Sequence, residues 1–262
     1  MSKFNTIAAL AIATLLAGCA TAPAPKNYSS FNAAKPRSIL IVPVINHTTE
    51  VEAGDLFLTT LAVPLAERGY YVFPTSAVKK LMEGDGLSNP QLVHEASTPR
   101  VAELFGADAV LYVEILEWHA QYAVLASGIE VSFLYTLKNG HDNSLLWQDQ
   151  QKIYVQRSGG SGNILADVIA AAVTAAVDNT RSDYTPVAAM ANNSALLVPG
   201  QGIPFGPYST FVSENPKVFP SLAAGPMTNA TLSAVAYPVE GLPTGFKDAE
   251  TPVAKTDAVK KP

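Results

Sequence analysis

The histidines are the first residues to consider for chemistry, because neutral imidazole serves as a metal ligand and as a general base. The chain has four, His47, His94, His119 and His141, and none stands in a His-Glu-x-x-His spacing. Glu117 and His119 would share one face of an extended strand and form a weak two-ligand pair. Two ligands at that spacing are common by chance, so we favour a solvated strand edge and predict no metal site.

Two other patterns fall short of a catalytic site. Gly159-Gly-Ser-Gly162 precedes a predicted helix, as a phosphate-binding loop does, but no Lys follows it. It also fails the Gly-x-Ser-x-Gly pattern, because Asn163 occupies the last glycine position. Glu114 and Glu117 are expected on opposite faces of a strand, which would prevent an acid–base pair. We interpret 159–162 as a hinge, and expect no enzyme, no catalytic residue and no cofactor.

Cys19 is the single cysteine, so the chain can form no internal disulfide. It follows an apolar run, Ile7–Ala17, with one early cation, Lys3. The run has 11 residues, whereas a membrane-spanning helix needs roughly 20. Its length is typical of the apolar segment of a secretory signal. An ordinary signal peptide with a chance Cys is the alternative, but this Cys stands where cleavage is expected.

Leu16-Ala-Gly-Cys19 resembles the lipobox of bacterial lipoproteins. The resemblance implies that residues 1–18 are a signal peptide and that Cys19 is acylated on sulfur, with chains such as palmitate. Each buried methylene contributes about 0.8 kcal/mol, so several chains hold a domain on a bilayer. Ala20, rather than Asp, follows Cys19, which resembles an outer-membrane address. We expect the domain to face the periplasm, with exposure on the cell surface as the alternative.

Composition agrees with a tethered, acidic domain. The 262 residues carry 17 Lys and Arg against 22 Asp and Glu, a net charge of −5, and loss of Lys3 with the signal makes it −6. This acidity argues against nucleic acid as a partner. Thr21–Arg37 has three prolines and no periodicity. We therefore predict that residues 19–37 form an extended tether.

Residues 38–208 are predicted to form an α/β domain. Strands and helices alternate first, which favours a parallel sheet with right-handed crossovers. The expected elements are strands Ser38–Ile45, Tyr70–Phe73 and Ala109–Leu116, with helices at Asp55–Arg68 and after Thr75, Asn89 and Thr98. Pro43 should mark an edge or a bulge in the first strand. Pro64 should kink the first helix or end it early.

An antiparallel hairpin is expected next. Apolar and polar residues alternate along Ile129–Leu137, Asn139-Gly140 is a hairpin signal, and Leu145–Val155 returns. A helix should follow from Thr185 to about Leu197. The whole is a mixed sheet with helices packed on it. Residues 209–262 are rich in proline and are predicted to be a largely disordered tail.

Asn163–Val177 is predicted to be an Ala-rich helix with few charges on any face. Burial within the domain, pairing with a second copy as a homodimer, and contact with a partner would all cover it, and burial is slightly favoured. The candidate self-association residues are Leu165, Val168, Ala171, Ala172 and Ala175.

Several longer motifs carry a resemblance across Arg37–Tyr208. They are Ile41-Val-Pro43 with Asn46-His47, Pro64–Pro74, Asp85–Ser88, Glu103–Ala109, Ala120–Leu125 and Gly202–Tyr208. They resemble a family of bacterial outer-membrane lipoproteins of unknown function, of the neisserial surface-antigen type. The resemblance implies a fold similar to the amino-terminal domain of TolB and, more distantly, to CsgG. The long membrane-inserting hairpin of CsgG has no counterpart here, which argues against a pore.

Three functions remain open. The first is a non-enzymatic envelope module that docks an unidentified partner protein, with a role accessory to secretion or surface assembly. The second is a periplasmic small-ligand binder that uses the loops Asn46–Thr49 and Pro74–Ser76, because ligands usually bind at the carboxyl edge of parallel strands. The third and least favoured is an enzyme.

Overall fold

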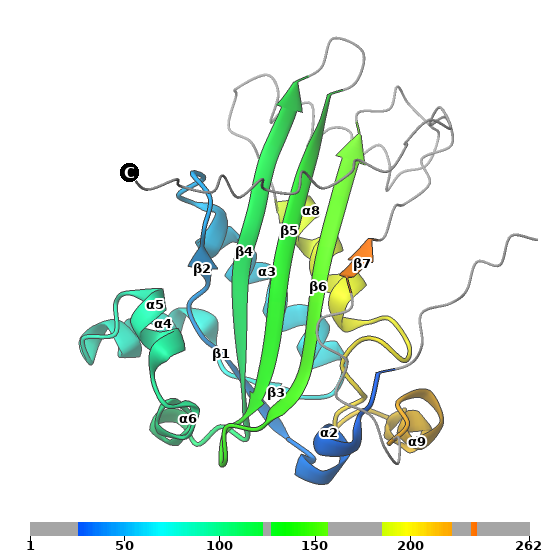
Figure 1. Ribbon diagram of the computed structural model, residues 1–262. Helices are drawn as coiled ribbons and strands as arrows, with labels where there is room; N and C mark the ends of the chain where they lie inside the picture. The colour runs from blue at the N-terminus through cyan, green and yellow to red at the C-terminus, as the bar shows by residue number, and fades with distance from the viewer. Residues whose placement is uncertain (1–25, 123–126, 157–184, 222–231, 235–262) are drawn as a thin grey trace, which may run out of the picture.

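The computed structural model describes residues 26–122, 127–156, 185–221 and 232–234 (Figure 1). Strands and helices alternate in the first half of the chain, and three long strands follow. In chain order the elements are α2 (Ser29–Ala34), β1 (Ser38–Ile41), β2 (Ile45–Asn46), α3 (Ala53–Glu67), β3 (Tyr71–Val72), α4 (Thr75–Gly84), α5 (Pro90–Glu95), α6 (Thr98–Phe105), β4 (Ala109–Tyr122), β5 (Ser127–Asn139), β6 (Leu145–Gln156), α8 (Thr185–Leu196), η1 (Val212–Glu214), α9 (Asn215–Val218) and β7 (Leu232–Ala234).

The first part of the sheet is parallel, as the sequence predicts. β1 lies between β3 and β4 and runs parallel to both. The apolar run is interrupted at Val42–Val44 and resumes as β2, which pairs with β4 further along. Pro43 lies at the centre of this break, where its missing N–H cannot support a ladder. The chain therefore leaves the regular sheet at the carboxyl end of β1.

The second part of the sheet is the predicted antiparallel hairpin, β5–β6, extended by a longer β4. Asn139 N–H closes the turn by donating to the Ser144 carbonyl at 2.8 Å. The register of β4 against β5 shifts between Ile115 and Glu117, which marks a β-bulge. Together these elements confirm a mixed α/β fold with parallel and antiparallel strands.

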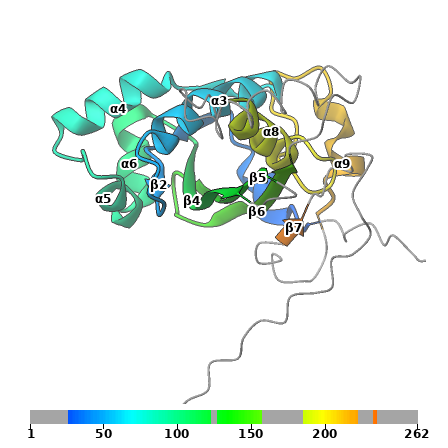
Figure 2. The same ribbon diagram turned by 90° about the horizontal axis from the view of Figure 1, so that it is seen from above.

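Helices cover the two faces of the sheet unequally (Figure 2). One face packs along its length against α3 and α8, and Phe57 of α3 stacks on Phe133 of β5 at 4.4 Å between ring centroids. Among the described elements, the other face packs against α4, α5 and α6 beside β1 and β4, where Leu40 and Val110 are fully buried. Buried apolar surface contributes about 25 cal/mol per Å² to folding, so the first face supplies most of the core.

The predicted tether does not extend to Arg37. Within it, α2 forms, and Tyr28 and Phe31 are only 1% and 3% exposed in the main core. The Tyr28 hydroxyl donates to the Gly202 carbonyl at 2.7 Å, and its ring packs edge-on against Phe219 at 5.1 Å. The sequence conceals these contacts because the partners lie far away in the chain. The described fold therefore includes the residues from Lys26 onward, and this part of the tether prediction is wrong.

The predicted tail boundary at residue 209 is also wrong. Residues 209–221 contain η1 and α9, and Phe219 is fully buried. β7 pairs in parallel with β6 through Gln150–Lys152. These elements are too short to give a helical or strand period in the sequence. Residues 222–231 and 235–262 lie outside the described residues, and the prediction for them stands untested.

Helix α3 continues through Pro64, where the sequence predicts a kink or an early end. Leu61 and Leu65 on either side of it are fully buried against the sheet, so tertiary packing outweighs the missing hydrogen bond. Cys19 and the predicted helix Asn163–Val177 lie outside the described residues. Among the residues that are described, no helix is long and apolar enough to cross a membrane.

Candidate functional site

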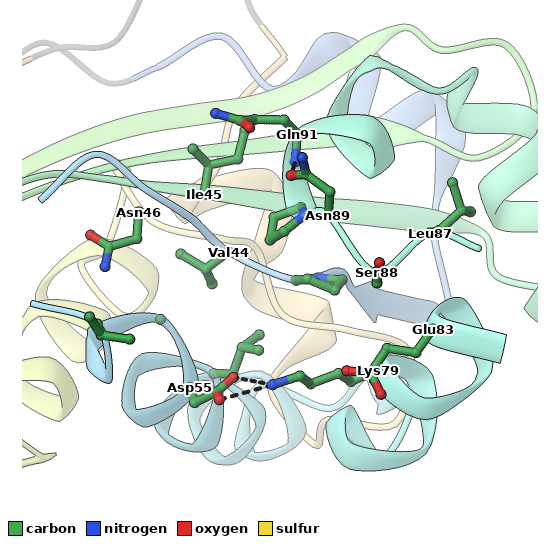
Figure 3. Close-up of a pocket in the computed structure, with 15 residues that line it drawn as sticks. Val44, Ile45, Asn46, Asp55, Lys79, Glu83, Leu87, Ser88, Asn89 and Gln91 are labelled. Carbon is green, nitrogen blue, oxygen red and sulfur yellow. Dashed lines mark hydrogen bonds and ion pairs between the residues drawn. The ribbon is translucent and has the colours of Figure 1, made fainter. Parts of the chain in front are cut away.

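A cleft of about 410 Å³ opens at the carboxyl end of β1 (Figure 3). One wall is the strand segment that contains β2. A second wall is formed by the first turns of α3 together with α4, and the third is the start of α5 with the loop before it. Apolar side chains such as Leu58 and Leu87 alternate around the cleft with polar ones. The cleft thus lies where the sequence analysis placed a ligand-binding edge.

The strand wall has an unpaired edge. His47 N–H donates to the Ile115 carbonyl of β4 at 3.0 Å, so the alternate residue Ile45 also faces β4. The main-chain groups of Val44 and Asn46 therefore point away from β4, toward the cleft. β3 covers only the start of β1, and no strand among the described residues pairs with this side of β2. An unpaired edge is a template for another extended chain.

His94 fixes the break in the strand. This α5 residue donates from Nε2 to the Pro43 carbonyl at 3.0 Å, and its ring lies edge-on to Tyr112 at 5.0 Å. Burial lowers the pKa of His94 below its ordinary value of 6.5, while the bond to Pro43 opposes the shift. The imidazole is thus a neutral donor that joins α5 to the irregular backbone.

Asn46 shapes the loop at the end of the cleft. Its Oδ1 accepts hydrogen bonds from Thr48 N–H at 2.9 Å and the Thr48 hydroxyl at 2.7 Å. Its Nδ2 donates to the Glu50 carbonyl at 2.6 Å, which completes an Asx-type turn. Of the two loops that the sequence analysis assigned to ligand binding, Asn46–Thr49 contributes to the cleft through Asn46. Pro74–Ser76 does not line it.

An ion pair crosses the floor of the cleft. Lys79 of α4 lies 2.6 Å and 2.9 Å from the two carboxylate oxygens of Asp55 in α3, with Glu83 one turn further along α4 (Figure 3). Asp55 and Lys79 are 69% and 39% exposed, so the pair stabilises the fold by at most about 1 kcal/mol. Its charges instead remain available to a bound molecule. No local sequence signal reveals this pair, because its members belong to different helices.

The remaining polar candidates of the sequence do not assemble into a catalytic or metal site. His47 Nε2 contacts Glu114 at 2.9 Å, and His141 lies 4.0 Å from Asp108. Asp108 accepts hydrogen bonds from Ser38 N–H at 3.1 Å and so joins β1 to β4. No group of three or more His, Cys, Asp or Glu that could hold a metal occurs within the described part of the chain.

Glu114 and Glu117 share one face of β4, contrary to the sequence prediction. The bulge between Ile115 and Glu117 adds one residue and reverses the alternation, so Ile115 and Trp118 both face the core. The two carboxylates still make separate pairs, because Glu117 contacts Lys152 at 3.1 Å. The proposed Glu117–His119 pair finds no support, since Glu117 is already paired and the His119 side chain lies outside the described residues.

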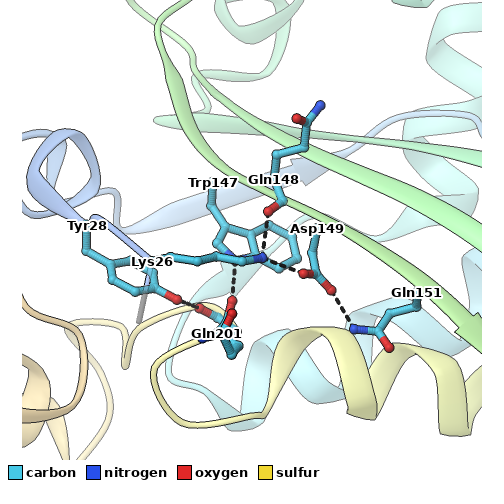
Figure 4. A network of polar contacts seen from close by, with 8 residues as sticks. Lys26, Tyr28, Trp147, Gln148, Asp149, Gln151 and Gln201 are labelled. Carbon is cyan, nitrogen blue, oxygen red and sulfur yellow. Dashed lines mark hydrogen bonds and ion pairs between the residues drawn. The ribbon is translucent and has the colours of Figure 1, made fainter. Parts of the chain in front are cut away.

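A buried ion pair holds Lys26, the first described residue, against β6 (Figure 4). Lys26 Nζ contacts the carboxylate of Asp149 and donates to the Gln148 carbonyl at 2.7 Å. Gln151 Nε2 donates to the other oxygen of Asp149 at 2.6 Å, and the ammonium lies 5.1 Å from the centroid of Trp147. Burial lowers the pKa of Lys26 and raises that of Asp149, and each partner's charge opposes the shift.

Two of the longer sequence motifs meet in a second buried junction. Arg68 donates to the carbonyl of Leu197 and lies 4.6 Å from the centroid of the Phe205 ring. Gly206 N–H donates to the Arg68 carbonyl at 2.8 Å, and a side chain at Gly206 would overlap the Gly69 carbonyl. The segments Pro64–Pro74 and Gly202–Tyr208 are thus held together for structural reasons.

Comparisons with known proteins identify relatives over most of the chain. Residues 26–208 match the profile of a family described as "Putative lipoprotein GNA1162-like". The chain is 34% identical over 217 residues to "Putative lipoprotein NMB1124/NMB1162" of Neisseria meningitidis serogroup B, covering 80% of this chain and 98% of the relative.

Solved structures include a member of the same family. The crystal structure of lipoprotein GNA1162 from Neisseria meningitidis is 32% identical, with a TM-score of 0.47, covering 55% of this chain and 99% of that one. The PelC dodecamer from Paraburkholderia phytofirmans is 17% identical, with a TM-score of 0.32 and coverages of 59% and 89%. The LpoB C-terminal domain from Salmonella enterica is 20% identical, with a TM-score of 0.32 and coverages of 45% and 84%.

The matched segment begins at Lys26, the residue that forms the buried ion pair with Asp149. The chain belongs to the GNA1162-like family of lipoproteins.

Proposed function

We propose that this protein is a lipid-anchored, non-enzymatic module of the bacterial outer membrane that docks an extended segment of an envelope partner protein. Acylation at Cys19 supplies the anchor, and the domain faces the periplasm. Family membership supports the lipoprotein character. The cleft supports the docking role. Whether the protein contributes to secretion or to surface assembly depends on the partner that it binds.

The unpaired edge of β2 is the observation that carries this proposal. An extended peptide can add to an exposed sheet edge, where main-chain hydrogen bonds give affinity and pockets for alternate side chains give specificity. Val44 and Asn46 present main-chain groups on this edge, inside the cleft. The paired part of β2 is short, with two residues. Few main-chain bonds are therefore available, and the surrounding side chains must contribute to selectivity.

Those side chains suit a polypeptide. The amides of Asn89 and Gln91 extend from the start of α5 over the strand (Figure 3), where they can donate to and accept from a peptide backbone. Asn89 Oδ1 accepts from Gln91 N–H at 2.9 Å, which holds the helix start in place. Lys79 and Glu83 of α4, at the floor of the cleft, offer one charge of each sign. Leu58 and Leu87 also line the cleft and offer apolar contacts to a bound peptide.

A small ligand is the second candidate, and the size of the cleft favours it. About 410 Å³ lies within the range of roughly 300–1,000 Å³ typical of small-molecule sites. A polar metabolite would use the same amides and charges but would not need the edge of β2. Protection of the strand amides from exchange therefore distinguishes the two occupants.

A photo-crosslinking amino acid at Val51 tests the proposal in intact cells. Val51 lines the cleft and is 90% exposed, whereas Val63 on α3 is 60% exposed and lies outside the cleft, which makes it a matched control. We expect a protein adduct from position 51 and none from position 63. Mass spectrometry then identifies the crosslinked segment of the partner. As a synthetic peptide, it should slow hydrogen exchange of the Val44 and Asn46 amides.

Two results would reject docking at this cleft. The same adducts from positions 51 and 63 would show non-specific capture. A peptide that leaves the exchange of Val44 and Asn46 unchanged would show that the partner binds elsewhere. A small molecule that co-purifies with the protein, and is lost on substitution of Gln91 by Ala, would support the second candidate instead.

Self-association through Asn163–Val177 remains a proposal from the sequence. Replacing Ala171 and Ala175 with Glu should leave a folded monomer, as measured by light scattering and circular dichroism. An unfolded product would mean that this face belongs to the core of the domain. An unchanged oligomer would mean that the helix is not the contact.

A further inference from the structure

A segment beside the start of the folded chain exposes large apolar side chains. Tyr208, Phe211 and Val212 are 67%, 61% and 42% exposed and lie within five consecutive residues, which we call the base segment, 208–212. An apolar groove of about 590 Å³ adjoins it, lined by residues that include Phe31, Tyr70, Phe205 and Val212. Clustered exposed apolar side chains of this kind mark a contact surface.

The base segment is held in position by the core. The rings of Phe211 and Phe205 lie 5.7 Å apart, those of Phe205 and Phe219 6.0 Å, and those of Phe219 and Tyr28 5.1 Å. Tyr208 N–H donates to the Gly69 carbonyl at 3.1 Å. The exposed side chains are therefore presented on a fixed backbone, only a few ring contacts from the first described residues of the chain.

The short link to the lipid limits where this surface can be. Lys26 is fixed by Asp149 and by its own N–H, which donates to the Gly200 carbonyl at 3.1 Å. Only residues 20–25 separate it from Cys19. Seven residue steps span at most about 25 Å, whereas a tether ending at Arg37 would span about 65 Å. The region around Lys26 must therefore stay close to the bilayer.

From these observations we infer that the base segment rests in the interface of the membrane that carries the Cys19 lipid. The inference depends on the proposed lipid anchor. Tyrosine and other amphipathic or apolar side chains favour the headgroup region, and their burial there adds to the energy of the acyl chains. Lys35 and Lys217 flank the segment and suit anionic headgroups, while Glu214 is the one acidic residue of η1.

This contact also orients the domain. The helices α4 and α5, which form the cleft, lie on the opposite side of the molecule from α9 in both views (Figures 1 and 2). A base segment in the interface therefore turns the cleft away from the lipid. Tether length and exposed aromatic residues together give a defined orientation rather than free tumbling on a flexible stalk.

A single introduced thiol tests the inference, because acylation consumes the natural one at Cys19. The mature lipidated protein carrying Phe211→Cys is labelled with an environment-sensitive fluorophore in vesicles of phosphatidylethanolamine and phosphatidylglycerol. Leu92→Cys on α5, where Leu92 is 49% exposed, is the matched control. We expect a blue-shifted emission at 211 and several-fold stronger quenching by spin-labelled lipid than at 92. Tyr208→Cys provides a second position if the 211 variant melts early.

The outcomes separate the two proposals. If the protein does not float with the vesicles, the lipid anchor is wrong and the inference falls with it. If the protein floats but the labels at 211 and 208 are quenched no more than the label at 92, the anchor stands and the membrane contact is overturned.

Discussion

The base segment and the cleft are built in opposite ways, although both are accessible regions of one small domain. The base segment is aromatic, and its Tyr208 N–H donates to the carbonyl of the buried Gly69. The cleft is polar, and its strand wall leaves main-chain groups of Val44 and Asn46 unpaired by any described strand. The base segment therefore suits the interface of a bilayer, and the cleft suits a partner that supplies hydrogen bonds.

The positions of the two regions relative to the proposed lipid anchor explain this difference. The base segment lies a few ring contacts from Tyr28, near the residues that a short link joins to the proposed lipid. In contrast, α4 and α5, which contribute walls of the cleft, lie on the opposite side of the molecule from α9 (Figures 1 and 2). A surface that must stay near a bilayer gains from exposed aromatic residues, which would promote aggregation elsewhere. A surface held away from the lipid can keep an open strand edge for a specific partner.

The largest effect is expected from the buried ion pair between Lys26 and Asp149. Lys26→Met leaves Asp149 buried without its charge partner, which should cost about 3–5 kcal/mol of unfolding free energy. Urea denaturation measures this cost. Lys35→Met, at an exposed lysine of the same region, is the control and should change little. Equal stability of the two variants would show that Lys26 does not anchor the chain.

Removing the buried hydroxyl of Tyr70 should have a smaller effect. Tyr70 is 4% exposed, and its hydroxyl donates to the Pro204 carbonyl at 2.8 Å. Tyr70→Phe should therefore lower stability by about 0.5–1.5 kcal/mol. The neighbouring Tyr71 is 53% exposed, and Tyr71→Phe should be neutral. The melting temperatures of both variants measure this difference. An unchanged melting temperature for Tyr70→Phe would show that the hydrogen bond to Pro204 does not stabilise the fold.

At the cleft, acidification should weaken the fold through His94. Burial lowers its pKa in the folded state, so the unfolded chain binds more protons once the pH drops to the ordinary value of 6.5. Stability from His94 is therefore fully present above pH 6.5 and is lost as the pH falls to the lowered pKa. His94→Gln should flatten this dependence. His141, which is 77% exposed, is the control, and an equal effect of His141→Gln would refute the assignment.

The smallest effect on stability, but a large one on binding, is expected at the floor of the cleft. Lys79→Glu breaks an exposed pair with Asp55 and should cost less than about 1 kcal/mol. It also makes the floor wholly acidic, so crosslinking of the partner from position 51 should drop sharply. Lys80→Glu, one residue along the same helix, changes the charge equally outside the cleft and should leave crosslinking intact.

Local signals in the sequence correctly predicted where helices begin and end and where the first strand is interrupted. Asn89 before Pro90 marks the start of α5, Gly106 ends α6 in the left-handed conformation, and Pro43 marks the break in the first strand. The bulge in β4 left no such signal and reversed the expected facing of Glu117. A one-residue insertion in register depends on pairing with β5, which the sequence of β4 alone does not reveal.

The sites were predictable only in part. The carboxyl edge of the parallel strands was expected to bind ligands, and Asn46 lies there. The pairs Asp55–Lys79 and Lys26–Asp149 join positions that are 24 and 123 residues apart, so only the folded chain brings them together. The base segment was missed because Tyr208 and Phe211 adjoin a proline-rich stretch without periodicity.

A photo-crosslinker placed in turn at Phe211 and at Val51 in living cells tests the account most directly, because one chemistry then reports on both regions. We expect phospholipid adducts from position 211 and adducts with a single polypeptide from position 51. Polypeptide adducts at 211 together with lipid adducts at 51, or the same mixture at both positions, would contradict it.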